Sequence, residues 1–518
     1  MNQKMKSPHQ AEFGDFQTPV ELAQELCEFL RFHGTDPKSI IEPTCGSGNI
    51  LRAAIMNFPN LERVLGVDVN GRYVAMAKAA IGGLNTTART EFLCQSFFDV
   101  DWWNKVQSMP RPLLVIGNPP WVTNSHLGVL GSDNLPIKMN IQQAGGLDAI
   151  TGKANFDISE WMLLRIAQCL SYPEASMAML CKTTVARKVL SSLWKSGAPI
   201  AHSQIVLIDA MRYFHAAVNA CLLHITFDSV AACDHAKVYS NFNAREVQAQ
   251  WGFKDGLLLA NMELFNKWQA ARTRRKTVWR SGIKHDCSAV MELDSLGEHR
   301  YRNGLGELCK LEDTFVYPML KSSHIHRGEY DESNRVMLVP QQFVGEDTAR
   351  IVDCAPLTWA YLQKYAHLLK KRSSAIYKNR PMFSIFGVGP YSFSPWKVGT
   401  SGLYKRINFV TIGCRAGKPY VLDDTCCFLS CQTRAQAELL TELLNSNPAR
   451  EALESMIFWD AKRPITVEIL ERLDLEKLAV ISGANQSTID AAAQCNYVKG
   501  RHKNSPASRD NLFTALMP

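Results

Sequence analysis

The sequence predicts a doubly wound α/β domain at residues 1–245, followed by an α+β domain at residues 246–518. Three observations lead to this division. Short apolar runs typical of buried strands alternate with helical spacing in the first half. A glycine-rich turn joins the first such strand to a helix, and polar residues gather where the strands end. Finally, 518 residues exceed what one hydrophobic core accommodates.

The composition is that of an ordinary globular protein, with 46% hydrophobic and 20% charged residues. We expect no membrane partner, because no stretch reaches the ~20 apolar residues of a membrane span. The amino terminus also lacks the apolar run of a signal peptide. The 15 cysteines are scattered singly without zinc-ligand spacing. They indicate reduced thiols in a cytoplasmic protein that needs no metal.

The first motif is Phe16-Gln17-Thr18-Pro19, which precedes apolar residues at helical spacing as far as Leu30. The sequence predicts Thr18 as the N-cap of this helix and Pro19 as its first residue. Free N–H groups at such a helix terminus can hold a carboxylate.

The strand expected at 39–42 runs into the turn Pro43-Thr44-Cys45-Gly46-Ser47-Gly48, and a helix is expected at 49–56. Strand, glycine turn and helix in this order let a backbone approach a ligand closely. The turn lacks the lysine and hydroxyl residue of a phosphate loop. Glu42, at the end of the strand, is placed to face the positive end of an amino-acid-like ligand.

A second strand, expected at 63–67, ends at Asp68, which lies 22 residues after Gly46. A spacing of ~20 residues is expected for an acid that binds the two hydroxyls of a ribose. A third strand at 91–94 is followed by Ser96. Because the carboxyl ends of parallel strands meet at one edge of a sheet, we expect these residues around one composite site.

The apolar run 113–117 ends in Asn118-Pro119-Pro120-Trp121. Two prolines end a strand sharply and remove two backbone donors. The Asn118 carboxamide oxygen and the Pro119 carbonyl are suited to accept both N–H bonds of an amino group on a flat ring. Trp121 is suited to stack on that ring. The tetrapeptide therefore predicts a site that draws the lone pair of an amino nitrogen out of conjugation.

A helix is expected at 158–170, and strands are expected at 178–181, 205–208 and 220–227. The turn before the last strand carries Tyr213 and Phe214, and either suits the second wall of a pocket for a planar ring. The glycine-rich stretch 122–155 is either a loop that closes over a substrate or plain surface irregularity.

The order of these motifs resembles that of the amino-methyltransferases that act on adenine in DNA, in the group whose cofactor motifs precede the catalytic motif. The resemblance covers residues 13 to about 240. It implies a class I methyltransferase fold, which is Rossmann-like, with S-adenosyl-L-methionine as cofactor and no metal. The carboxyl half would then be a DNA target-recognition domain.

The resemblance also implies roles for individual residues. The expected catalytic residues are Asn118, Pro119, Pro120 and Trp121. Trp121 and Phe214 would stack on an adenine swung out of the duplex. The residues expected to hold the cofactor are Phe16, Thr18, Pro19, Glu42, Cys45, Gly46, Gly48, Asp68, Ser96, Phe97 and Asn118. The family usually has an acid where Ser96 stands, in contact with the amino group of the cofactor adenine, so either Ser96 or the nearby Asp99 takes that contact here.

In the second half we expect a helical connector from Glu246 to Phe265 and two cationic clusters. The first, at 267–284, has seven basic residues and no acid, with Trp268 and Trp279 among them; the second lies at 370–380. Clustered cations with aromatic residues suit a phosphate backbone, and a solvated helical face is the alternative. The expected DNA contacts are Arg272, Arg274, Arg275, Lys276, Lys371 and Arg372. The stretches 386–397 and 401–406 resemble target-recognition segments.

The predicted function is site-specific methylation of the N6 amino group of adenine in double-stranded DNA, by a bacterial or phage-encoded enzyme of restriction–modification or phage defence. A cognate restriction endonuclease or a defence-system protein would be its partner. The same tetrapeptide also suits methylation of adenine in RNA or of a glutamine amide in a protein. A nucleic-acid binder without catalysis and a fused nuclease are further alternatives. The cationic clusters favour a long polyanion, and Asn118 with Trp121 favours catalysis.

Overall fold

The computed structural model describes residues 16–122, 157–170, 172–228, 232–272, 277–328 and 333–495. These residues divide into two compact units, the first ending at Met262 and the second beginning at Glu263. None of the helices in these ranges has the length and apolar character that crossing a bilayer requires. The expected glycine-rich loop, apart from Val122, and the cations Arg274, Arg275 and Lys276 lie outside the described residues.

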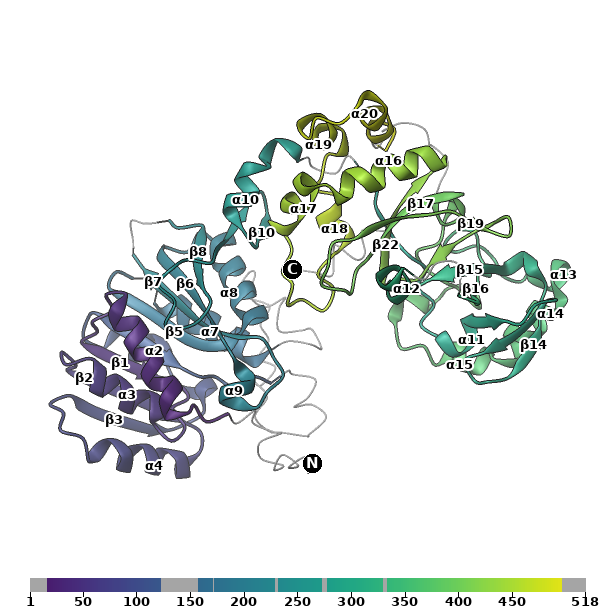
Figure 1. The fold of residues 1–518 in the computed structure, drawn as a ribbon. Helices are drawn as coiled ribbons and strands as arrows, with labels where there is room; N and C mark the ends of the chain where they lie inside the picture. Colours follow the sequence, from purple (N-terminus) through teal and green to yellow (C-terminus); the bar gives the residue numbers. More distant parts are fainter. Residues whose placement is uncertain are drawn as a thin grey trace. The chain divides into compact units, whose positions relative to one another are not determined.

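The first unit is built on one large sheet (Figure 1). Its strands are β1 (Ser39–Glu42), β2 (Arg63–Asp68), β3 (Arg89–Cys94), β4 (Leu113–Gly117), β5 (Ala175–Lys182), β6 (Ile200–Ile208), β7 (Ala220–Phe227), β8 (His235–Tyr239), β9 (Ala249–Lys254) and β10 (Leu257–Leu259). Its helices are α2 (Val20–Phe32), α3 (Asn49–Asn57), α4 (Gly71–Gly82), α5 (Trp102–Gln107), α7 (Ile158–Cys169), α8 (Thr183–Lys195) and α9 (Ala210–Phe214).

The sheet is doubly wound and Rossmann-like, as expected. Strands β3, β2, β1, β4 and β5 lie side by side in that order and are all parallel. Strand β7 then runs antiparallel between β5 and β6. The strand order reverses between β1 and β4, which is the place where ligands bind in such sheets. Glu42 ends β1 at this reversal, and Asn118 follows β4 there.

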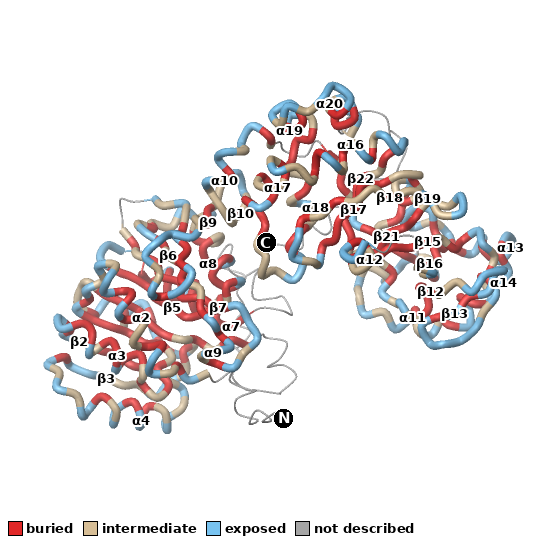
Figure 2. The backbone as a smooth tube through the Cα atoms, in the orientation of Figure 1, coloured by how far each residue is buried: buried red, intermediate tan, exposed pale blue. Residues whose placement is uncertain are grey.

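Helices cover both faces of the sheet. On one face α2 and α3 share a core with alternate strand residues such as Ile40 and Leu114. Helices α5, α7 and α8 form the other layer, in which α7 and α8 contact each other and β5. The central strands are buried on both sides, as Figure 2 shows, because each lies between two helical layers. For this reason, strands are found at the apolar runs from which they were expected.

The helical connector expected from Glu246 to Phe265 is wrong. Most of that range is the β9–β10 hairpin, which pairs through β8 with the main sheet, and helix follows only from Met262. The hairpin turn is Asp255-Gly256, with φ of 54° and 76°. An Asp-Gly pair between two short runs is a strong hairpin signal. The division between the units consequently falls after residue 262 and not at 245.

The second unit has the expected α+β character. Its strands form a four-stranded sheet in the order β11-β22-β17-β18, a six-stranded sheet in the order β14-β13-β12-β16-β15-β21 and the small pair β19-β20. These strands are β11 (Arg280–Ser281), β12 (Glu292–Ser295), β13 (Arg300–Asn303), β14 (Leu308–Lys310), β15 (Val316–Leu320), β16 (Arg335–Leu338), β17 (Trp396–Ser401), β18 (Phe409–Ile412), β19 (Cys414–Arg415), β20 (Lys418–Pro419), β21 (Val421–Leu422) and β22 (Cys426–Cys431). The helices are α10 (Met262–Lys267), α11 (Ser288–Met291), α12 (Ser322–Arg327), α13 (Ile351–Cys354), α14 (Pro356–Lys364), α15 (Ala366–Lys370), α16 (Arg434–Asn445), α17 (Asn447–Glu454), α18 (Val467–Leu470), α19 (Leu475–Ile481) and α20 (Gln486–Ala493).

Candidate functional site

A cavity of about 480 Å³ lies at the carboxyl edge of the main sheet. This volume is within the range of small-molecule sites. Among the expected cofactor residues, those that line it are Phe16, Thr18, Glu42, Cys45, Gly46, Asp68, Ser96, Phe97 and Asn118. Four strand ends, the Phe16–Pro19 segment and the start of α7 therefore meet around one space, and that space joins Asn118 to the glycine turn.

The glycine turn is held in place by Asp68. One carboxylate oxygen accepts the Gly46 N–H at 2.9 Å, and the other accepts the Asn70 N–H at 2.8 Å. Gly46 and Gly48 both have positive φ, of 50° and 84°. A Cβ at Gly48 would lie 3.0 Å from the Ala77 backbone of α4, so glycine is needed for the helices to approach. Asp68 therefore joins the glycine turn to the end of β2.

Glu42 is a buried carboxyl group at the wall of the cavity. It is 2% exposed, and its Oε2 has no hydrogen-bond partner among the described residues. Burial, and then the Asp68 carboxylate, raise the pKa of Glu42 well above its usual value. A cation in the cavity would oppose this effect and favour the ionised carboxylate. Burial likewise raises the pKa of the Cys45 thiol, which stays neutral.

The Asn118 carboxamide is oriented by the amino-terminal segment. Its Nδ2 donates to the Phe16 carbonyl oxygen at 2.9 Å and to Thr18 Oγ1 at 3.2 Å. Both amide protons are thereby used, whereas Oδ1 has no hydrogen-bond partner within the described part of the chain. Asn118 thus retains an acceptor, and the expected binding of an amino group by this oxygen stays a prediction.

The expected N-cap role of Thr18 is wrong. Helix α2 begins at Val20 with Pro19 in the cap position, and no side chain caps it. The Thr18 hydroxyl contacts Asn118 instead, and the Thr18 carbonyl accepts from Asn49 Nδ2 at 2.8 Å. The Thr18 hydroxyl, which would otherwise cap the helix, is thus engaged in a tertiary contact. Pro19 does not line the cavity.

Gln17 is a site residue that the motif analysis passed over. Its Oε1 accepts the Ser47 N–H at 3.0 Å and thereby ties the amino-terminal segment to the glycine turn. The contact is close, because a Cβ at Gly46 would lie 2.5 Å from the same oxygen. The signal available in the sequence was the position of Gln17 between Phe16 and Thr18, which were both expected to hold the cofactor.

Trp121 lies beside the cavity in an aromatic cluster. Its ring centroid is 5.1 Å from that of Phe214 and 5.7 Å from that of Phe16, and the Trp121–Phe214 contact is edge-to-face. Trp121 and Phe214 are 6% and 7% exposed. A base stacked between the two rings would require them to separate.

Helix α9 presents Phe214, and not Tyr213, to Trp121. Tyr213 points to α2, where its hydroxyl donates to Glu25 at 2.8 Å. Burial and this carboxylate raise the pKa of Tyr213 to about 12. Arg212 of α9 forms an ion pair with Glu21, which also lies on α2. These contacts fasten α9 to α2, and they leave Phe214 as the residue that faces the tetrapeptide.

Ser96 lines the cavity at the end of β3, and its hydroxyl accepts the Phe98 N–H at 3.3 Å. Asp99, the other candidate for the same contact, is exposed and does not line the cavity. Phe97 is buried and packs against Trp102, with ring centroids 4.8 Å apart. The geometry therefore favours Ser96 for the expected contact.

Several cations of the second unit are engaged within the fold. Arg372 donates to the carbonyl oxygens of Leu369, His285 and Ser384, and its guanidinium lies over the Tyr377 ring. Arg272 is half-buried over the Phe265 ring. Lys371, by contrast, is exposed. Arg372 and Arg272 thus support the packing of this unit, and Lys371 remains available to an outside anion.

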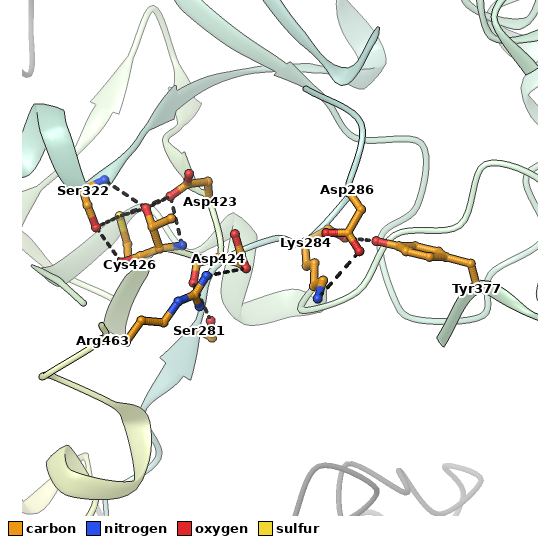
Figure 3. Close-up of polar contacts among 10 residues, drawn as sticks. Ser281, Lys284, Asp286, Ser322, Tyr377, Asp423, Asp424, Cys426 and Arg463 are labelled. Carbon is orange, nitrogen blue, oxygen red and sulfur yellow. Dashed lines mark hydrogen bonds and ion pairs between the residues drawn. The ribbon is translucent and has the colours of Figure 1, made fainter. Parts of the chain in front are cut away.

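Three further residues of the first cluster, Trp268, Trp279 and Lys284, are also engaged within the fold. Trp279 is 1% exposed in the core, and the Trp268 indole donates to Glu451 at 2.7 Å. Lys284 pairs with Asp286 at 3.6 Å, as Figure 3 shows. Trp279 is thus part of the core, which the sequence pattern alone could not distinguish from a binding surface.

No family model matches this sequence. A Type II methyltransferase of Nostoc sp., M.NspV, is 43% identical over 471 residues, which cover 91% of this chain and 98% of that protein. The chain belongs to the Type II methyltransferases. It is therefore a DNA methyltransferase of the restriction–modification type, as its motifs indicated.

Solved structures also resemble this methyltransferase. The Type IIL restriction–modification enzyme MmeI in complex with DNA matches with a TM-score of 0.49 and 12% identity, over 95% of this chain and 76% of that one. The methyltransferase subunit of a type I restriction–modification system from Streptococcus thermophilus matches with a TM-score of 0.32 and 14% identity, over 43% of this chain and 47% of that one. The family assignment rests on the Nostoc relative.

Proposed function

We propose that this methyltransferase transfers a methyl group from S-adenosyl-L-methionine to the N6 amino group of adenine in duplex DNA. The observation that carries the proposal is the Asn118 Oδ1, which has no partner among the described residues and belongs to a residue that lines the same cavity as Asp68 and the glycine turn. An acceptor held in a water-poor site next to a nucleoside-sized cavity suits an amino group that has to be activated.

The lining residues fit S-adenosyl-L-methionine. Asp68 offers acceptors to ribose hydroxyls, and the buried Glu42 carboxyl offers an acceptor to the ammonium of the methionine part. Ser96, which lines the cavity, would contact the cofactor adenine. When bound, this cofactor supplies an electrophilic methyl group on a sulfonium, and the chain supplies position and dipoles. Within the described residues there is no cluster of three or more metal-ligating side chains.

The chemistry of the target follows from two acceptors. Asn118 Oδ1 and the Pro119 carbonyl would accept the two N–H bonds of the adenine amino group and draw its lone pair out of the ring. The same dipoles would stabilise the positive charge that develops on nitrogen. Trp121 and Phe214 would hold the ring plane, after the adenine has left the duplex at a cost of a few kcal/mol. No strong general base is required before transfer.

For the DNA we propose contacts from Lys371 and from Arg274, Arg275 and Lys276. A restriction endonuclease of the same specificity is the proposed partner of the enzyme. Methylation of RNA adenine or of a protein glutamine is the second candidate, because the Asn118 acceptor suits any conjugated planar amide or amine. The family relationship favours DNA over both.

The decisive experiment is sequencing of modified bases in DNA from cells that express the chain, compared with cells that express the Asn118→Ala variant. We expect N6-methyladenine within one short recognition word and only with the wild-type chain. Methylation of cytosine would contradict the assignment of the base. Labelling of folded RNA that equals or exceeds labelling of duplex DNA would favour the second candidate.

A further inference from the structure

Lys182 makes a contact that neither the motifs nor the family relationship explains. It is the last residue of β5 and precedes α8. Its Nζ donates to the Trp121 carbonyl oxygen at 3.1 Å and forms an ion pair with Asp157 Oδ2 at 2.8 Å. The side chains of Lys182 and Asp157 are 22% and 10% exposed, so solvent screens this pair only in part.

The partner of Lys182 belongs to the wall of the cofactor cavity. Asp157 caps α7, because its Oδ1 accepts from the N–H and the hydroxyl of Ser159. The next residue, Ile158, lines the cavity, and its N–H donates to the Val122 carbonyl at 3.0 Å. One ammonium group thus joins the catalytic tetrapeptide to the helix that borders the cofactor.

The tetrapeptide needs such an external donor. Pro119 and Pro120 have no N–H, so backbone hydrogen bonds donated from these positions cannot fix the turn. Strand β5 compensates at two points: the Leu180 carbonyl accepts from the Trp121 indole at 3.4 Å, and Lys182 binds the Trp121 carbonyl. The first contact orients the ring, and the second fixes the backbone that carries it.

We propose that Lys182 is a positioning residue for methyl transfer, which holds the backbone of Trp121 in register with the cofactor cavity. The inference rests on the proposed function of the Asn118–Trp121 site. Lys182 touches neither substrate nor cofactor. It acts by fixing the turn whose displacement by 1 Å would misalign the amino nitrogen with the methyl group.

The chain offers a matched control in Lys188. This residue forms an ion pair with Glu160 at 2.8 Å, and so it too joins α8 to α7. Within the described part of the chain it does not contact the tetrapeptide, and its side chain is 56% exposed. If the Lys182–Asp157 ion pair only packed α8 against α7, replacement of Lys182 and replacement of Lys188 would have similar effects on methyl transfer.

The test compares Lys182→Met, Lys182→Arg and Lys188→Met in full-length protein. Single-turnover methyl transfer to unmethylated plasmid DNA should fall about 10- to 100-fold in Lys182→Met, since small misplacements cost this much. Cofactor affinity by calorimetry and DNA affinity by filter binding should stay within about twofold. Lys182→Arg, which keeps a cationic donor, should recover part of the rate, and Lys188→Met should match the wild type.

A second readout follows the target base. In duplexes with 2-aminopurine at the methylated position found by sequencing, Lys182→Met should lose most of the fluorescence increase that the wild type produces on binding. If Lys182→Met and Lys188→Met give equal rates and equal fluorescence, the positioning role is refuted. If the wild type itself neither methylates DNA nor raises the fluorescence, the proposed function has failed instead.

Discussion

The side-chain amide of Asn118 donates to the carbonyl oxygen of Phe16 at 2.9 Å, across 102 positions of the sequence. This bond and the one to Thr18 decide which atom of the amide is left over. Because both N–H groups of the amide nitrogen are used in these two bonds, the amide oxygen is the atom that remains for a substrate. The Phe16–Pro19 segment therefore serves two purposes: it borders the cavity, and it determines which atom of the proposed catalytic residue is left as an acceptor.

Replacement of Asn118 by alanine should abolish most of the methyl transfer. Loss of one preorganised acceptor or donor in a dry site costs about 10²–10³ in rate. Quench-flow or single-turnover labelling of DNA would measure the step directly. Asn57→Ala is a useful control, since Asn57 is a buried asparagine of the same unit that contacts Gln24 and Ala53 and lies outside the cavity. Full activity of Asn118→Ala would place the catalytic centre elsewhere.

Asp68→Ala should weaken cofactor binding about 10- to 100-fold, because it removes the proposed acceptors for the ribose and the bond from Gly46 that holds the turn. Isothermal titration with S-adenosyl-L-methionine measures the effect. Glu62→Ala is the matched control, since Glu62 is an exposed acid just before the other end of β2 and forms an ion pair with Lys38. Equal affinities for the two variants would remove Asp68 from the cofactor site.

Trp121→Ala should lower both activity and stability, since the ring is buried in the core and also belongs to the proposed target site. Truncation of a buried tryptophan costs about 3–5 kcal/mol. Trp121→Phe should keep most of the stability and part of the activity, because a smaller ring can still stack. Thermal melting together with the methylation rate separates the two effects, and a stable but inactive Trp121→Phe would show that the indole itself is required.

Glu42 should make the cofactor-free protein less stable as pH rises. Its pKa is raised in the folded chain, so above its unfolded value of ~4.3 the unfolded chain releases a proton that the folded chain retains. Stability then falls by up to ~1.36 kcal/mol per pH unit until the folded pKa is passed. Glu42→Gln lacks this dependence. The difference in melting temperature between the two proteins, in favour of Glu42→Gln, should therefore grow from pH 5 to pH 8; a constant difference would show an ionised Glu42.

Combined replacement of Arg274 and Arg275 by alanine should flatten the salt dependence of DNA binding. Each phosphate contact contributes roughly 0.9 to the slope of log affinity against log salt concentration, so the slope should fall by nearly 2. Arg372→Ala should instead lower the melting temperature, because its guanidinium holds three carbonyls of the second unit. An unchanged slope in the double variant would assign Arg274 and Arg275 to a solvated face.

Local sequence was a good guide wherever burial imposes a pattern. Strands lie with the expected limits at 39–42, 113–117 and 220–227, because each is built around apolar residues that helices cover on both sides. It failed at 249–259, where pairing with β8 at the sheet edge decides the conformation. It also failed to separate cations that bind carbonyls within the fold, such as Arg372, from exposed ones such as Lys371.

The sequence by itself determined the central strands of the sheet, the glycine turn and the chemical character of the Asn118–Trp121 tetrapeptide, because these depend on residue type and short spacing. Only the tertiary structure decided which atom of Asn118 remains unpaired, which aromatic residue of α9 faces Trp121, and that Lys182 holds the tetrapeptide. Each of these depends on a contact between residues far apart along the chain. Such contacts are fixed by the packing of the sheet and its helices, and nothing in the local sequence specifies them.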